Sequence, residues 1–159
     1  MADLLGDGNI KLTVVSTLSS KSSPTATQLN AGIDIQAYVT KDGLDIKVDQ
    51  SAVDNTALAS RAETEDAGTT KYDASLTYKK QDTTLGDVAF NALSPGDLIW
   101  LAIRRDRANE TAWAAGQPAE IFPARCGAYM RQPPKLNEPQ LIEQKMFIYE
   151  QPDTEAVVA

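Results

Sequence analysis

Apolar and polar residues alternate one by one through much of this 159-residue chain, and this alternation limits its fold more than any other feature. The pattern covers residues 10–14, 33–39, 44–48 and 72–78. A period of two places successive side chains on opposite faces of an extended strand. Antiparallel sheets commonly bury one face and expose the other, so these runs predict antiparallel strands.

The second and third runs are separated by Thr40–Gly43, which ends in Asp-Gly. Asp-Gly is a strong signal for a two-residue hairpin turn, because both residues tolerate a positive φ. The sequence therefore predicts a β-hairpin over residues 33–48. Residues 50–71 are rich in Ala, Thr, Asp and Glu, and there we expect a short strand over 57–61 and a mobile loop over 63–70.

The spacing of apolar residues becomes helical between Leu85 and Leu93. Thr84 is placed to cap this helix, with Asp87 three residues later as the other half of a capping box. Ser94–Gly96, which contains a proline, is expected to end it. We expect one helix of about ten residues, which must pack on the sheet because so short a helix is marginal alone.

The C-terminal half contains the apolar run Leu98–Ile103, which predicts a central strand covered on both faces. Residues 121–130 and 142–150 predict two further strands, and the small polar residues 151–159 predict a flexible tail. The expected fold class is mostly β, a sandwich or barrel of about seven or eight antiparallel strands with one flanking helix. We expect a single domain over residues 1–150.

The residue types present exclude several kinds of chemistry. The chain has no histidine, which removes the triads that depend on it and the commonest zinc ligand. Its one cysteine, Cys126, cannot form a disulfide within the chain, which is typical of assembly in a reducing compartment. We expect neither a secretory signal nor a membrane helix. We also expect no enzymatic activity, cofactor or metal site.

The charge balance is acidic, with 22 acidic and 15 basic residues and a net charge of −7. Proteins that grip nucleic acid usually present a basic surface to the phosphates, so tight binding is disfavoured. Arg104, Arg105 and Arg107 form a basic cluster, but Asp106 and Glu110 lie close in sequence. We therefore expect salt bridges from these arginines in preference to phosphate contacts.

Several segments of the chain resemble, in their order and composition, the tail tube (major tail) proteins of siphophages, particularly those that infect actinobacteria. The segments are Asn30–Gly32, Phe90–Leu93, Pro95–Asp97, Arg104–Arg105, Gly116–Gln117, Ile121–Gly127 and Asn137–Glu138. The resemblance covers most of the chain and is weakest over residues 50–70. It includes no catalytic motif.

This resemblance implies a β-sandwich subunit with a helix on its flank, which assembles into stacked rings that are usually hexameric. The resulting hollow tube guides linear DNA during genome ejection. It also implies a tape measure protein, a tail terminator and tip proteins as partners, assembly in the host cytoplasm, and a final location in the virion tail.

An acidic lumen would let DNA slide, since a basic lining would hold its phosphates. The outward residues of the predicted hairpin, Asp34, Asp45 and Asp49, are candidates for that lining, and a solvated sheet face is the alternative. Glu63, Glu65 and Asp66 lie in the predicted loop over 63–70, which is either a ring-to-ring contact or a simple flexible loop.

Two further residues have candidate roles. Trp113 lies in a polar segment, so we expect it to be exposed and to act as an interface anchor. Cys126 lies in a predicted strand, where a buried thiol behaves as a small apolar side chain.

Other functions stay open at this point. A tail terminator or the tube protein of a contractile injection system would share the fold. A monomeric β-sandwich that binds carbohydrate would show an exposed aromatic platform and no assembly. A hydrolase that uses paired carboxylates is the weakest alternative, because no spacing selects a pair.

Overall fold

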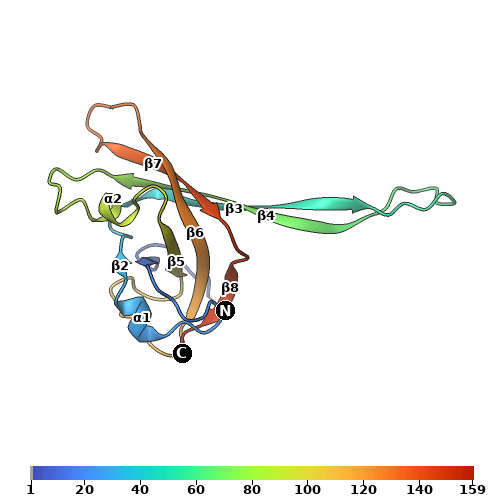
Figure 1. Ribbon diagram of the computed structural model, residues 1–159, viewed down its shortest axis with the longest axis horizontal. Coiled ribbons are helices and arrows are strands. Elements are labelled where there is room, and N and C mark those ends of the chain that lie inside the picture. The colour runs from blue at the N-terminus through green and yellow to red at the C-terminus, as the bar shows by residue number, and fades with distance from the viewer. Residues whose placement is uncertain (1) are drawn as a thin grey trace.

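Eight strands in residues 2–159, the part of the chain that the computed structural model describes, pair antiparallel into one sheet (Figure 1). This confirms the mostly β fold class. The elements are β1 (Lys11–Val15), α1 (Ala26–Asn30), β2 (Ile33–Asp34), β3 (Val39–Asp54), β4 (Glu65–Lys79), α2 (Val88–Ala92), β5 (Leu98–Arg104), β6 (Pro118–Arg131), β7 (Leu141–Ile148) and β8 (Asp153–Val157).

The sheet has the order β2-β1-β5-β6-β7-β4-β3, with β8 paired to β6 outside this path. The long strand β6 organises the C-terminal half. Its first residues, Pro118–Ile121, pair with β8, and its last residues, Ala124–Arg131, pair with β7. β7 and β8 therefore follow one another along the same strand, while β5 occupies the other edge of β6.

The core lies on both faces of β5. Leu101 and Ile103 point into a large cluster that also contains residues of β1, β4, β6, β7 and α2. Ala102, between them, points into a second cluster with Leu29 of α1 and Ala156 of β8. Because successive strand residues face opposite ways, both faces of β5 must be covered. The prediction of a central strand over Leu98–Ile103 is confirmed.

A buried amide joins the middle of the sheet to the end of α2 and to an irregular part of β6. Gln144 of β7 accepts a hydrogen bond from the Tyr78 hydroxyl at 3.0 Å. Its Nε2 donates to the carbonyl oxygens of Leu93 at 2.8 Å and Gly127 at 3.0 Å. These bonds join the end of α2 and an irregular part of β6 to the middle of the sheet, and they satisfy polar groups that water cannot reach.

The predicted hairpin over residues 33–48 is wrong. Ile33–Asp34 pairs with β1, while β3 runs on through Asp42–Gly43 without turning back. The register of β3 against β4 shifts between Val39 and Leu44, so Asp-Gly lies in a bulge. A side chain at Gly43 would collide with the Thr77 carbonyl oxygen, and this close approach explains the glycine.

The hairpin of the structure joins β3 to β4 instead. Its register extends outward to the pair Asp54–Glu65. The predicted strand over 57–61 is therefore wrong, since those residues form the turn, and most of the predicted loop over 63–70 is strand. The residues are polar on both faces, so no alternation marked them as strand.

The helix predictions need correction as well. α2 has five residues, and Leu85 before it is exposed. Thr84 does not cap it, because the helix begins at Val88 with Asp87 at the N-cap position. The buried carboxylate of Asp87 makes no cap bond either, and accepts from the Lys80 ammonium group and the Gln81 amide. α1 was not predicted, although Thr25 caps it through a bond from the Gln28 amide at 3.2 Å.

The predicted flexible tail over 151–159 is in part a strand. β8 pairs with the start of β6, and Ala156 and Val158 are buried in the second cluster. The Gly116 amide also donates to the Val158 carbonyl oxygen at 2.8 Å. The alternation of Ala156 and Val158 was too short to outweigh the polar composition of this segment.

Replacing Gln144 by alanine should lower the free energy of unfolding by about 2–4 kcal/mol, because it leaves the partners of a buried amide unsatisfied. Chemical denaturation of the purified protein measures this. Gln140→Ala, at an exposed position, is the matched control and should change the free energy by less than about 0.5 kcal/mol. Equal effects of the two variants would contradict the role given to Gln144.

Candidate functional site

The distal halves of β3 and β4 form an arm, residues 48–72, that projects from the rest of the molecule (Figure 1). β7 pairs with β4 only from Asp73 onward, so in residues 2–159 the two arm strands pair with each other alone. Each strand therefore presents one unpaired edge along the arm. Unpaired edges invite pairing with another chain.

The arm has no core of its own. Val48, Val53 and Leu58 are exposed, Leu58 fully so at the turn. The turn is nevertheless ordered by its own polar groups, because the Thr64 hydroxyl donates to Asn55 Oδ1 at 2.7 Å. A two-stranded ribbon is marginally stable in water. The arm is thus ordered in the single subunit, yet little stabilises it. A partner that covered its apolar side chains would stabilise it further.

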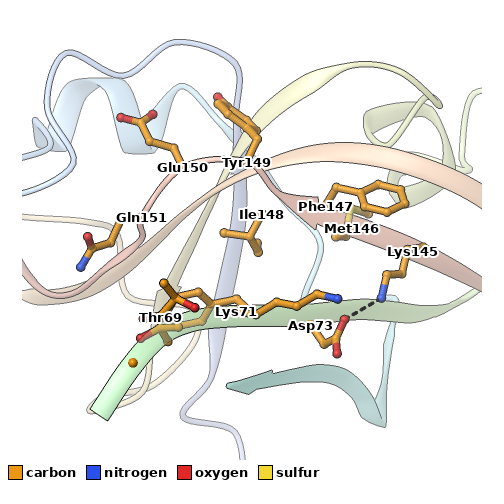
Figure 2. Close-up of a pocket in the computed structure, with 13 residues that line it drawn as sticks. Thr69, Lys71, Asp73, Lys145, Met146, Phe147, Ile148, Tyr149, Glu150 and Gln151 are labelled. Atoms are coloured by element: carbon orange, nitrogen blue, oxygen red, sulfur yellow. Dashed lines mark hydrogen bonds and ion pairs between the residues drawn. The ribbon is translucent and has the colours of Figure 1, made fainter. Parts of the chain in front are cut away.

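A groove of about 650 Å³ lies at the root of the arm. It is lined by Gly68–Asp73 of β4 and by Lys145–Gln151, which includes the end of β7 (Figure 2). The groove exists because β4 and β7 separate beyond the pair Asp73–Phe147. We call it the root groove. Phe147 and Tyr149 are about half exposed along it.

Three of the four charged side chains that line the root groove form ion pairs. Lys145 bonds Asp73 at 3.0 Å, and this bond holds the pKa of the Asp73 carboxyl below its usual value. Glu150 bonds Lys21 at 3.1 Å. Lys71 forms no ion pair with any of residues 2–159 and lines the same groove, with its side chain directed toward Asp73 (Figure 2). Lys71 is thus the one lysine of the groove lining without an ion pair in the described chain, although its charge also helps to lower the pKa of the Asp73 carboxyl.

The three candidate lumen residues do not lie together. Asp45 and Asp49 are on β3, whereas Asp34 is on β2, at the opposite end of the strand order. The Asp34 carboxylate accepts from Lys11 Nζ at 3.1 Å and from the Thr13 hydroxyl at 2.6 Å. Asp34 therefore neutralises a buried lysine of β1.

The three acidic residues expected in a loop lie instead on the outer part of the arm. Glu63 is in the turn, and Glu65 and Asp66 begin β4. All three are exposed. The structure thus places them together, on an ordered element that extends away from the body.

The expectation of an exposed Trp113 is wrong. Only 3% of this side chain is exposed, and its indole N–H donates to the Thr13 hydroxyl at 3.0 Å. The Arg104 guanidinium lies over its ring, 5.2 Å from the centroid. Although the neighbouring residues in sequence are polar, Trp113 belongs to the second apolar cluster, with Val15 and Leu29. A side chain buried in its own subunit cannot anchor a neighbour.

The three arginines behave differently from one another. Arg105 pairs with Glu120, and Arg107 pairs with Asp106 at 2.7 Å, as expected for salt bridges. Arg104 is buried and has no carboxylate partner in the described chain. Its guanidinium donates to the Gln117 side chain and to three carbonyl oxygens, those of Ala108, Thr111 and Ala112. It therefore fixes the loop that carries Trp113.

A family model described as "Phage tail tube protein" matches residues 1–159, the whole chain. The chain belongs to the phage tail tube protein family. No curated protein matches it in sequence. The projecting arm and the root groove are thus features of a tail tube protein, and its role is a structural one in the virion tail.

This tail tube protein has no group of three His, Cys, Asp or Glu side chains that could hold a metal ion within residues 2–159. No helix in the same range is long and apolar enough to cross a membrane. Cys126 is buried, and burial raises the pKa of its thiol to about 11. The interpretation of Cys126 as a structural residue is confirmed.

Sequence reasoning missed the arm and the root groove. One signal was available: residues 25–94 contain no proline, so nothing in β3 or β4 would interrupt a long ladder. The groove had no sequence signal, because it depends on where β7 leaves β4.

Replacing Asp34 by alanine should destabilise this tail tube protein by about 1–2 kcal/mol, since the buried Lys11 ammonium group loses its carboxylate partner and keeps only the Asn109 carbonyl oxygen, while Asp34 itself is partly solvated. Asp49→Ala, at an exposed position, is the control and should change stability by less than about 0.5 kcal/mol. Urea denaturation compares the two. Equal losses would mean that Asp34 does not have this structural role.

The thiol of Cys126 should resist labelling by a thiol reagent at about pH 8, because a buried thiol with a pKa near 11 is almost fully protonated there. The same reagent should label it fully in denaturant. Mass spectrometry of the native and unfolded samples tests this. Rapid labelling of the native protein would contradict the burial of Cys126.

Proposed function

We propose that copies of this chain assemble into hexameric rings, and that the rings stack into the hollow tube through which the phage genome is ejected. The observation that carries the proposal is the arm, an ordered ribbon with two open edges and exposed apolar side chains. Family membership gives the tail tube role. The arm supports the way in which subunits join.

Ring closure would pair the open edges of the sheet. The outer edge of β3 ends the strand order and is unpaired along its length in the described chain. An edge of 16 residues is a strong template for another strand. If each subunit presents this edge to a different surface of its neighbour, the contact is heterologous, and it closes into a ring when the rotation fits.

The arm would then join rings. Its outer end carries Glu63, Glu65 and Asp66, together with the fully exposed Leu58. A contact that buried Leu58 would stabilise the arm and the stack together. The acidic side chains would form the polar rim of this contact and restrict it to a partner of suitable charge.

The lumen would be lined in part by Asp45 and Asp49 of β3. With a net charge of −7, the subunit favours a surface that repels phosphates, so that DNA passes without specific binding. Asp34 is the weaker candidate, since its carboxylate already neutralises Lys11.

The proposed partners are other copies of the chain, a tape measure protein around which the tube forms, and terminator and tip proteins at its ends. Assembly would take place in the host cytoplasm, without enzymatic activity or a cofactor. A tail terminator or contractile-system tube protein is the nearest alternative within this class.

Removing residues 52–67, so that Ser51 joins Gly68, should abolish tube formation and leave a folded subunit, because none of the core residues lies in the deleted part. Negative-stain electron microscopy of both proteins at high concentration, with and without the tape measure protein, measures assembly. Circular dichroism and thermal unfolding check the fold.

The unaltered chain is the positive control, and Leu136→Asp, at an exposed residue outside the arm, is the matched surface control. Tubes formed as well by the shortened chain would remove the arm from the assembly contact. Persistent monomers of the unaltered chain under both conditions would contradict the proposal and favour the monomeric binding module.

A further inference from the structure

The root groove is shaped by a strand edge that nothing in the described chain covers. β4 pairs with β3 on one side from Glu65 onward, but with β7 on the other side only from Asp73. The edge over Glu65–Tyr72 is therefore open toward the groove. β7 ends at Ile148 and does not extend along it. The next residues turn away toward β8, and Lys21 bonds Glu150 at 3.1 Å and the Gln151 carbonyl oxygen at 2.8 Å.

The lining of the groove indicates what would fit. A strand added to β4 would satisfy the unpaired backbone groups, and its side chains would meet Phe147 and Tyr149 (Figure 2). Lys71 adds a positive charge that has no ion-pair partner within residues 2–159. The matching occupant is a short extended segment with apolar side chains and an acidic one.

One segment of this chain has those properties. Ala2–Leu5 has no regular structure, and Leu4 and Leu5 are 67% and 65% exposed. None of its backbone amides donates to another backbone group within the described residues; the next residues are fixed by bonds to Gly6 and Gly8. Asp3 lies directly before the two leucines.

The dimensions agree. Four residues in extended form span about 13 Å at roughly 3.3 Å per residue, so Ala2–Leu5 fits within the open edge over Glu65–Tyr72. In the single subunit none of residues 2–5 lines the root groove. Within residues 2–159, the leucine side chains of the segment are exposed and the β4 edge of the groove is unpaired.

We propose that Ala2–Leu5 of a neighbouring copy adds as a short strand to the open edge of β4 in the root groove. A leucine of the segment packs on Phe147 and Tyr149, and Asp3 pairs with Lys71. This inference rests on the proposed assembly, because it needs a second copy placed beside the first.

Cysteine cross-linking between different copies tests the contact. One preparation carries Leu4→Cys and another carries Thr69→Cys, at an exposed residue of the groove. The two are mixed, assembled and oxidised. Because Cys126 is buried and each variant has one new thiol, a covalent dimer of the two variants reports contact between chains only. Ala59→Cys, at the exposed turn of the arm, replaces Thr69→Cys in the control mixture.

The expected result is a mixed disulfide dimer with Thr69→Cys at least five times more abundant than with Ala59→Cys. Replacing Lys71 by glutamate in the Thr69→Cys chain should lower its yield several-fold, and adding Asp3→Lys to the Leu4→Cys chain should restore it. Tubes that form without the mixed dimer would overturn this inference and leave the proposed function standing. A mixed dimer without tubes would support the contact and contradict the tube. A chain with both cysteines that links within itself as a monomer would overturn the role of the neighbour.

Discussion

The placement of β5 between β1 and β6 is the constraint on which the rest of this structure depends. A strand hydrogen-bonded on both edges and apolar on both faces must be covered from both sides. The large cluster provides one cover, through the curled sheet and α2. The second cluster covers the other face, with residues of α1 and β8 and with Trp113. α1, α2, β8 and Trp113, which are far apart in the sequence, therefore all pack in the two clusters that cover β5.

Buried polar groups then determine how the loops meet this core. Gln144 holds the end of α2 and the irregular part of β6, and Arg104 holds the loop that carries Trp113. Within residues 2–159 Arg104 has no carboxylate partner; its two terminal nitrogens donate to carbonyl oxygens and to the side chain of Gln117, its guanidinium lies over an indole ring, and its buried Nε makes no hydrogen bond. Its position makes the loop dependent on the sheet, since the guanidinium cannot return to water without opening the core.

The arm, in contrast to these buried elements, has no packed core. Its strands are long and regular, yet they bury almost nothing, and their outer edges have no partner within the described chain. A protein that functioned as a monomer would gain little from such an element, because unpaired edges promote aggregation. In a family whose members form tail tubes, the same property is useful. The subunit is stable through β5 and its neighbours, and the arm can be reserved for contacts between subunits.

The sequence by itself determined the strand-rich class, the buried central strand and the buried Cys126, because each is written in local alternation or in a continuous apolar run. It could not determine which strands pair. The Asp-Gly signal at Asp42–Gly43 was overruled by the pairing of Ile33–Asp34 with β1, and the polar environment of Trp113 concealed a buried cation. Only the tertiary structure decided the arm and the root groove. Both arise where two strands separate, and the point of separation depends on contacts between residues distant in the chain, which no local pattern encodes.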